Sequence, residues 1–443
     1  MSPPTRRPAA GDDDRRALAE WAASGAMAIT GRSDGPPLGP PDRLVDGLAR
    51  SAAVVRDRSA SLGVPVDLDP VALLGERAAV AGLTRHGETS CGGTTRLVRA
   101  RDGWLAVALP RLEDRELLPA WLGIDAIDAF GAGDAGDADA PWPAVVAALA
   151  GSRAGDAVER ASLLGLPVSQ LPGEPVAAVA AAPPLAPLPV RATRVPAPAP
   201  EPRPLTAMTV VDLSSLWAGP LCGSILGAAG ARVVKLESTG RADGSRAGPR
   251  LFFDLVNGGK QGVALDLAGD DGWTVLRRLL AAADVVIEGS RPRVLEQRGI
   301  FAADLVADAG PRVWVSITGH GRTGVGRDRA AFGDDAAVAG GLVVADASGP
   351  CFCADAAADP AAGLAAAAAC LDALAIGGRW VLDVALAGVA ASLAGPTLVT
   401  GGGSPGRGPI AGVAPPRARH ARHRGPELGE HTAAVLGGLG VTT

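Results

Sequence analysis

The sequence predicts an α/β protein built on a doubly wound, mostly parallel sheet of the Rossmann-like kind, with a smaller α+β domain at the N-terminus. Three observations lead to this prediction. After residue 205, β-type runs alternate with helical runs across short connections, which is typical of a parallel sheet covered by helices. Residues 90–123 instead have the pattern of a hairpin followed by a helix. Between these regions, residues 181–204 contain nine prolines, a composition that favours an extended, semi-rigid linker.

The elements follow from local patterns. The helix expected at 219–230 has Pro220 at its start and Gly230 at its end, which are the residues that helix termini favour. The N-terminal hairpin is expected to turn at residues 101–103, where a charged pair precedes a glycine. Apolar runs of strand length and one further amphipathic run complete the C-terminal region. Strands are expected at 208–215, 231–238, 262–267, 284–290 and 312–321, and a second helix at 270–283.

The chain is therefore predicted to have three segments. Residues 1–180 form an N-terminal domain, residues 181–204 a linker rich in proline and alanine, and residues 205–443 the large domain. The N-terminal domain also contains one copy of a weak internal repeat. Residues 23–49 resemble residues 339–365 of the large domain in the order of glycine, apolar and acidic positions.

The two copies of this repeat differ at one position of chemical interest. Arg43 lies four residues before Gly47 in the first copy, whereas Asp359 lies four residues before Gly363 in the second. If the repeat is real, the first copy has lost whatever role the aspartate has.

Composition limits the classes of function. The net charge of −5 argues against a general nucleic-acid binder. Five cysteines with no CxxC pair and no secretory leader favour a reducing, cytoplasmic setting. No run reaches 18 uninterrupted apolar residues, so no membrane span is expected. His420 and His423 lie among arginines without further ligands, so no metal site is expected.

Asp359 precedes an alanine-rich stretch and is itself followed by Pro360. Taken alone, this pattern predicts a helix start, with the aspartate as N-cap, the proline at the first helical position and the carboxylate at the positive end of the helix dipole. A catalytic role for the carboxylate is the alternative. The other motifs of common enzymes do not help, since HExxH and GxxxxGK[ST] do not occur and the turn after the first expected strand of the large domain has no GxGxxG.

Several segments, in order, together resemble the class III CoA-transferase family of the CaiB/BaiF type. This family includes formyl-CoA and carnitine or bile-acid CoA-transferases and α-methylacyl-CoA racemases. The first segment reads "VVDLSSLWAGPLCGSILGAAGARVVKLES", and the last "GPELGEHTAAVLGGLG". The resembling segments are residues 210–238, 257–300, 313–324 and 425–440.

The resemblance implies a transfer of CoA from an acyl-CoA donor to a small carboxylic acid, through an aspartyl anhydride and an aspartyl-CoA thioester. Asp359 matches the family nucleophile, an aspartate four residues before a glycine. CoA is then a substrate, no cofactor is bound permanently, no metal is needed, and a homodimer is expected. The other positions that carry over are Trp217, Ala218 and Gly219 in the loop lining the CoA thiol, Lys235, Lys260 and Arg291 as cations near the nucleotide, and Gly92 and Gly93 as the glycine loop over the acyl intermediate. Each of these cations has an ordinary surface position as its alternative, and the two glycines have a plain hairpin turn.

The order of the segments departs from the family. The stretch that resembles its small domain, residues 90–109, precedes the linker here, which suggests a shortened tandem or permuted arrangement. Two other functions stay open. One is a racemase, although Phe332 stands where family racemases have a histidine, and Asp334 or Asp335 would have to substitute as the second base. The other is an acyl-CoA-binding protein without turnover.

Overall fold

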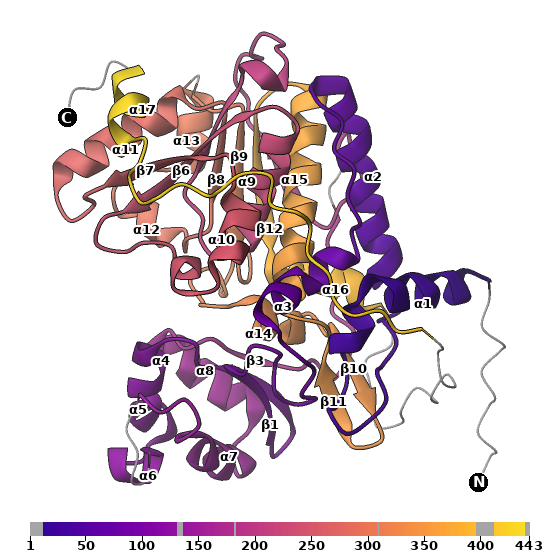
Figure 1. Cartoon of the computed structure of the whole chain (residues 1–443). Coiled ribbons are helices and arrows are strands. Elements are labelled where there is room, and N and C mark those ends of the chain that lie inside the picture. The colour runs from indigo at the N-terminus through magenta and orange to yellow at the C-terminus, as the bar shows by residue number, and fades with distance from the viewer. Residues whose placement is uncertain (1–11, 131–135, 181–182, 309, 396–411, 439–443) are drawn as a thin grey trace.

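The computed structural model describes residues 12–130, 136–180, 183–308, 310–395 and 412–438. A large sheet with helices on both faces forms one part of the molecule, a smaller unit lies below it, and the N-terminal helices stand along one side (Figure 1). The helices are α1 Asp12–Ser24, α2 Leu44–Leu62, α3 Glu76–Ala81, α4 Leu112–Glu116, α5 Leu118–Leu122, α6 Ala126–Phe130, α7 Trp142–Ala150, α8 Ala154–Leu164, α9 Ala218–Ala228, α10 Arg250–Asn257, α11 Asp270–Ala282, α12 Arg293–Glu296, α13 Ala302–Ala307, α14 Gly333–Ala339, α15 Ala358–Ile376, α16 Leu386–Ala394 and α17 Thr432–Gly438. The strands are β1 Thr95–Ala100, β2 Gly103–Ala108, β3 Val168–Gln170, β4 Arg191–Arg194, β5 Thr209–Asp212, β6 Arg232–Ser238, β7 Gln261–Leu265, β8 Val285–Glu288, β9 Val313–Thr318, β10 Val343–Asp346, β11 Gly349–Phe352 and β12 Trp380–Ala385.

The large sheet has seven strands in the order β4-β12-β9-β8-β5-β6-β7. All neighbours are parallel except β4, which pairs antiparallel with β12 at one edge. The strand order reverses between β5 and β8, and ligands of doubly wound folds bind at the carboxyl ends of the strands beside such a switch point. The predicted fold class is confirmed, and each strand expected after residue 205 is present.

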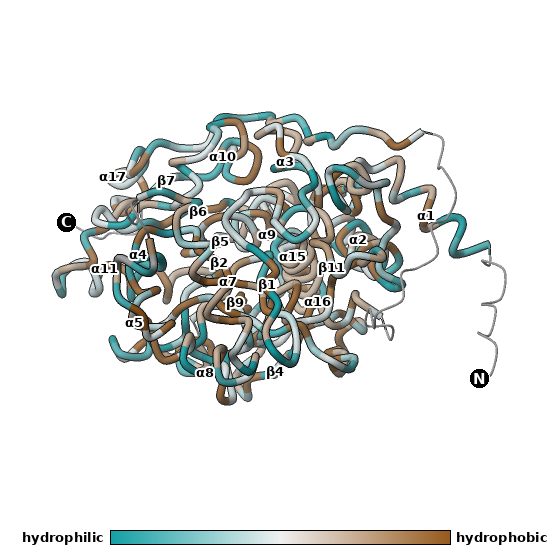
Figure 2. Tube along the Cα trace, turned by 90° about the horizontal axis from the view of Figure 1, so that it is seen from below, coloured by the Kyte–Doolittle hydropathy of each residue, from teal (hydrophilic) through white to brown (hydrophobic). Residues whose placement is uncertain are grey.

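Helices bury both faces of this sheet. One face packs on α9, α15, α16 and α2, and the other on α11, α13 and α17. In the trace coloured by hydropathy, hydrophobic segments gather in the interior around β9, α15 and α16, while α1 and α4 are largely hydrophilic and lie outside (Figure 2). The sheet strands are nearly continuous apolar runs because both of their faces are covered.

The smaller unit has its own core. Strands β1, β2 and β3 form an antiparallel sheet, and helices α5, α7 and α8 pack on it. The hairpin of β1 and β2 turns between Ala100 and Gly103 as predicted. A few apolar contacts from Leu97 and Ala106 join this unit to α14 and to the β10-β11 hairpin.

The N-terminal helices do not belong to the core of the smaller unit, contrary to the predicted domain of residues 1–180. Trp21, Leu48 and Leu73 are buried in the same core as α15 and the large sheet. The physical reason lies in α15, because an alanine-rich helix that is apolar all round needs neighbours on every side. Helix α2 supplies one of these neighbours.

The predicted linker is also more than a spacer. Residues 191–194 form strand β4, and Leu185, Leu188 and Val190 are buried. An extended segment between prolines has free backbone donors and acceptors, so it pairs with the open edge of the sheet. Proline spacing alone did not reveal this pairing.

A C-terminal segment, residues 412–431, crosses the molecule from the N-terminal helices to the sheet (Figure 1). Arg419 forms an ion pair with buried Glu76, and the Ala414 N–H donates to the Ala22 carbonyl. Further along, Arg246 donates to the Pro426 carbonyl. The segment therefore fastens the first eighty residues to the large domain.

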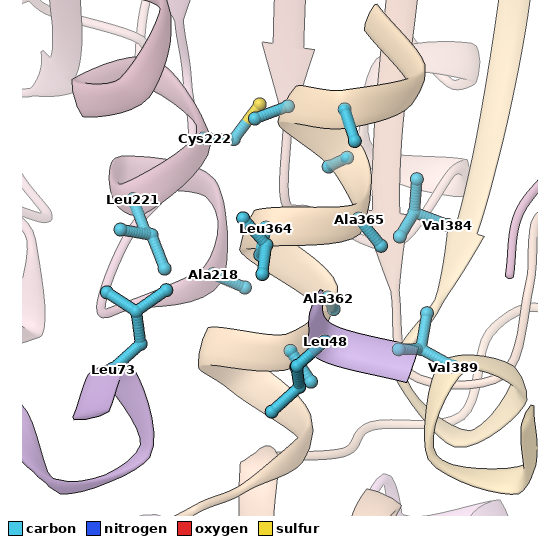
Figure 3. Close-up of a cluster of buried hydrophobic side chains, with 14 of the residues drawn as sticks. Leu48, Leu73, Ala218, Leu221, Cys222, Ala362, Leu364, Ala365, Val384 and Val389 are labelled. Carbon is cyan, nitrogen blue, oxygen red and sulfur yellow. The ribbon is translucent and has the colours of Figure 1, made fainter. Parts of the chain in front are cut away.

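Helix α15 is the centre of the main core (Figure 3). By length and composition it would pass for a membrane span, but 78% of its apolar window is buried inside the protein. It packs closely on α9 at Gly363: a Cβ on this residue would lie 2.5 Å from the Ala218 carbonyl oxygen and 3.1 Å from Leu221. Gly363 is therefore explained by close packing of two helices.

We expect Gly363→Ala to lower the free energy of unfolding by about 1–3 kcal/mol, because the added methyl group meets backbone that cannot move aside easily. The measurement is urea denaturation followed by tryptophan fluorescence. Gly155→Ala in α8 is the matched control, since nothing lies within 4 Å of the Cβ it would add. It should leave stability unchanged or raise it. Equal stability of the two variants would contradict the packing argument.

Candidate functional site

Asp359 lies in the first turn of α15. The N-cap is Ala357, so Asp359 is the second helical residue and its side chain makes no capping hydrogen bond. The predicted N-cap role, with Pro360 at the first helical position, is therefore wrong. The chain enters the helix through Ala354 and Ala356 with positive φ angles of 56° and 45°, which starts the helix before the aspartate and turns the carboxylate toward α14 rather than back onto its own turn. A Cβ on Gly333 of α14 would lie 2.7 Å from the Asp359 Oδ2 atom.

Asp359 as a residue is half-buried, whereas almost all its neighbours are buried. Burial raises its pKa to about 7, the Arg77 guanidinium opposes this rise, and the charges of Asp334 and Asp355 add to it. A hydrogen bond from the Gly333 N–H favours the ionised form. At neutral pH the carboxylate is thus close to half ionised, rather than fully ionised as its place near a helix N-terminus suggested.

Two further carboxyls lie in α14 behind Asp359. Asp334 accepts from the Ala356 N–H at 3.1 Å, and burial raises its pKa to about 6. Asp335 accepts from the Ser169 hydroxyl at 3.0 Å, and burial raises its pKa to about 7. Both side chains are buried and engaged by the protein, which leaves Asp359 as the accessible carboxyl of this cluster.

Arg77 of α3 is the cation that faces these carboxyls. It donates two hydrogen bonds to fully buried Asp355, Nε to Oδ2 at 2.8 Å and Nη2 to Oδ1 at 2.5 Å. Its guanidinium also lies over the Trp217 ring, 5.6 Å from the centroid. No pattern in the sequence indicates Arg77 or Asp355, because neither belongs to a motif and they are 278 positions apart in the chain.

The loop predicted to line the CoA thiol, Trp217 to Gly219, lies beside this cluster. Trp217 is buried and is the N-cap of α9, and Ala218 and Gly219 open the helix. Ala218 touches α15 at Gly363, one turn after Asp359. The two helix starts therefore lie next to each other.

The predicted glycine loop is also brought here. Gly92 and Gly93 are exposed, and a Cβ on Gly92 would lie 3.3 Å from the Arg77 Nη2 atom. Gly93 has a φ of +79° and its N–H closes a turn onto the Ser90 carbonyl. The loop is a tight turn before β1, as the alternative of a plain turn predicted. It lies next to Arg77 and the carboxyl cluster.

The two predicted lysines lie elsewhere. Lys235 forms a fully buried ion pair with Asp243, and Lys260 forms one with Asp212. The Lys260 ammonium donates as well to the Pro220 carbonyl and to Asn257. Both ammonium groups are enclosed by protein acceptors, so in this structure neither reaches a nucleotide phosphate. They stabilise the loops after β5 and β6 instead, a role that sequence position alone could not separate from phosphate binding.

Arg291 lies in a cavity of about 340 Å³ between the smaller unit and the loop after β8. No hydrogen bond from its guanidinium is recorded within the described part of the chain. Burial lowers its pKa from the ordinary value, and neighbouring Arg293 and Arg111 lower it further. The arginines that line this cavity are Arg111, Arg291, Arg293 and Arg329.

The cavity and the carboxyl cluster are adjacent. Arg111 lies over the Phe332 ring at 5.4 Å, and Phe332 directly precedes Gly333, the residue that contacts Asp359. Among the described residues, no group of three or more His, Cys, Asp or Glu side chains has an arrangement that could hold a metal ion.

The fold and this site define a doubly wound α/β protein with a carboxylate at the start of a core helix and a basic cavity beside its switch point. The model of CoA-transferase family III matches residues 205–428. The chain belongs to this family.

Individual relatives match smaller parts. A succinyl-CoA–D-citramalate CoA-transferase of Chloroflexus aurantiacus is 33% identical over 148 residues, covering 32% of this chain and 37% of the relative. An (R)-2-hydroxy-4-methylpentanoate CoA-transferase of Clostridioides difficile is 35% identical over 186 residues, covering 38% and 46%. A solved CAIB/BAIF family protein from Brucella suis is 29% identical with a TM-score of 0.40, covering 44% of this chain and 56% of that one. The chain thus spans less than half the length of these two curated relatives.

The raised pKa of Asp359 predicts how stability depends on pH. The folded state keeps the proton up to about pH 7, whereas an unfolded aspartate loses it near its ordinary pKa of 3.8. This group therefore makes the protein less stable as pH rises from about 4 to 7. We expect Asp359→Asn to raise the free energy of unfolding at pH 8 by about 1 kcal/mol or more, and the gain to shrink toward pH 4.

Urea denaturation of both proteins at pH 5 and pH 8 measures this effect. Glu174→Gln, which changes an exposed carboxylate, is the control and should show no such pH-dependent gain. If Asp359→Asn were less stable than the wild type at pH 8, the carboxylate would not be the strained group that its surroundings indicate.

Proposed function

We propose that this protein is a CoA-transferase that moves CoA from an acyl-CoA donor to a small carboxylic acid, with Asp359 as the nucleophile. The observation that carries the proposal is the position of Asp359: it is the accessible carboxyl in a buried cluster, at the start of the core helix of a family III domain. A buried carboxylate is poorly solvated, which increases its reactivity, and its pKa of about 7 leaves a large ionised fraction at neutral pH.

The reaction follows from this nucleophile. The ionised carboxylate attacks the acyl-CoA thioester, the C–S bond breaks, and a mixed acyl-aspartyl anhydride and CoA thiolate result. The thiolate attacks the aspartyl carbonyl and releases the donor acid, which leaves an aspartyl-CoA thioester. The acceptor carboxylate then repeats the two steps in reverse order, so a new acyl-CoA leaves and Asp359 is regenerated.

The developing oxyanions need hydrogen-bond donors. The start of α15 offers few, because Pro360 has no N–H and the Asp359 N–H already donates to the Ala356 carbonyl at 2.8 Å. The first-turn amides of Ala218 and Gly219 in α9 have no acceptor within their helix and lie beside the same site. We assign the oxyanion contacts to this loop, each worth on the order of 3 kcal/mol.

The nucleotide end of CoA fits the cavity at Arg291. The cavity is lined by four arginines and by the carboxylates of Glu113, Asp114 and Asp328, and Arg111 already pairs with Asp114. We therefore assign the phosphate contact to Arg291, because guanidinium groups bind phosphate oxygens in pairs. Phe332 connects this cavity with Asp359, so an extended CoA molecule could lie with its phosphates at the arginines and its thioester at the carboxyl cluster.

Transfer is favoured over the two alternatives. A racemase needs a second base on the opposite face of the substrate, but Phe332 cannot titrate, and Asp334 and Asp335 are buried and hydrogen-bonded. A binding protein without turnover has no need of a carboxyl with a raised pKa at the site. The homodimer and the cytoplasmic location stay predictions.

Asp359→Asn keeps the size of the side chain and removes the nucleophile, so we expect transferase activity to fall by at least about a thousandfold with folding intact. The assay uses succinyl-CoA with a panel of small carboxylic acids, and mass spectrometry follows the products. Hydroxylamine should convert Asp359 to a hydroxamate only in wild-type protein that has met acyl-CoA. Full activity of the variant, or no adduct in active wild-type protein, would remove Asp359 from the mechanism.

Arg291→Gln is expected to weaken CoA binding roughly tenfold, because one charge-assisted contact to phosphate is lost. Calorimetric titration with CoA at low and high salt measures the affinity and its salt dependence. Arg278→Gln is the matched control, since Arg278 is exposed on α11, away from the cavity. Equal losses in both variants would indicate a general charge effect instead of a site.

A further inference from the structure

Three carboxyls lie near Asp359; two of them, Asp334 and Asp355, raise its pKa, and one close cation, Arg77, opposes them. The thiols near the site, Cys91 and Cys353, are neutral because burial raises their pKa. The charge of Arg329 lowers the pKa of Asp335 on α14. The charged groups packed around Asp359 are thus Asp334 and Asp335 on α14, Asp355 in the segment before α15, and Arg77 on α3.

Two contacts fix the Arg77 side chain. Its guanidinium donates to both carboxylate oxygens of Asp355, and its Cζ atom lies 5.6 Å from the centroid of the Trp217 ring. Gly92 has no side chain that would displace it, since a Cβ there would lie 3.3 Å from Nη2. A planar guanidinium with a bidentate partner and an aromatic face has little freedom to turn away. A lysine would carry the same charge without this fixed orientation.

Arg77 lies outside the part of the chain that matches the family model, which begins at residue 205. It reaches the site because α3 is held against the large domain through Glu76, which is buried and paired with Arg419 of the C-terminal segment. The N-terminal region therefore contributes a charged group to a site whose nucleophile belongs to the family domain.

We propose that Arg77 is a positioning residue of the active site, which holds Asp355 in place and supplies the positive field that keeps the Asp359 carboxylate ionised for attack. The catalytic part of this inference rests on the proposed function. The electrostatic part does not, since the protonation of Asp359 can be followed without substrate.

The two members of the ion pair act on Asp359 in opposite directions. Removing the charge of Arg77 leaves three carboxyls unopposed and favours the protonated nucleophile. Removing the charge of Asp355 takes away one repelling carboxylate and frees Arg77 to act on Asp359. A pair with a merely structural role would give two variants that lose stability alike without moving the titration of Asp359 in opposite directions.

The experiment is an infrared titration of the protonated carboxyl stretch, with each protein compared with its own Asp359→Asn derivative so that the difference isolates Asp359. Arg77→Met should raise the midpoint by about one pH unit or more, and Asp355→Asn should lower it. Arg77→Lys should stay near the wild type, and the double variant Arg77→Met with Asp355→Asn should lie between the single variants.

The matched control is Arg58→Met. Arg58 pairs with Asp372, which is fully buried in the same helix but more than three turns further along, so its loss should leave the midpoint of Asp359 unchanged. An equal shift in this control, or shifts of one sign in Arg77→Met and Asp355→Asn, would overturn the proposal. If the two variants shift the midpoint in opposite directions but the wild-type protein transfers no acyl group, the effect of Arg77 on Asp359 is upheld and the proposed function is overturned. If the wild-type protein transfers acyl groups but the two variants do not shift the midpoint in opposite directions, the proposed function is upheld and the role of Arg77 is overturned.

Discussion

The close packing of α15 against α9 is the constraint on which the other features depend. The helix is rich in alanine and buried over most of its length, so it gains stability only if its neighbours come near. Gly363 allows the backbone of α9 at Ala218 to approach within van der Waals distance. This contact fixes how deep the start of α15 lies, and with it the depth of Asp359.

The depth of Asp359 in the protein determines its pKa. A carboxyl held partly accessible among buried groups has a raised pKa, and the carboxyls of α14 and of the segment before α15 raise it further. An exposed aspartate at a helix start would be fully ionised, well hydrated and a weak nucleophile. The same burial makes a nearby cation necessary for the proposed role of Asp359, since otherwise its carboxyl would hold its proton at neutral pH.

The sequence predicted the elements of the large domain well, because strands and helices of a doubly wound sheet follow from short-range patterns and the turn residues mark their ends. It also singled out Asp359 and the loop at Trp217. The misses are contacts between distant segments: β4 pairing with β12, α2 packing on α15, and Arg77 meeting Asp355. Lys235 and Lys260 show the opposite failure, since a lysine beside a predicted loop has no local feature that separates a buried ion pair from a phosphate ligand.

These contacts determine what the N-terminal region and the family domain each contribute to the core and to the candidate site. Residues 205–428 contain six of the seven strands of the large sheet, Asp359 and Arg291. Without the N-terminal region, however, α15 lacks a cover on the side of α2, and Asp355 lacks its partner Arg77. Packing and charge are thus supplied by the same segment: α2 buries the apolar helix, and α3 brings the guanidinium to its first turn. The proposed role of Asp359 is compatible with the segment order of this chain for this reason, because that role requires a covered helix and a fixed cation, whichever part of the chain provides them.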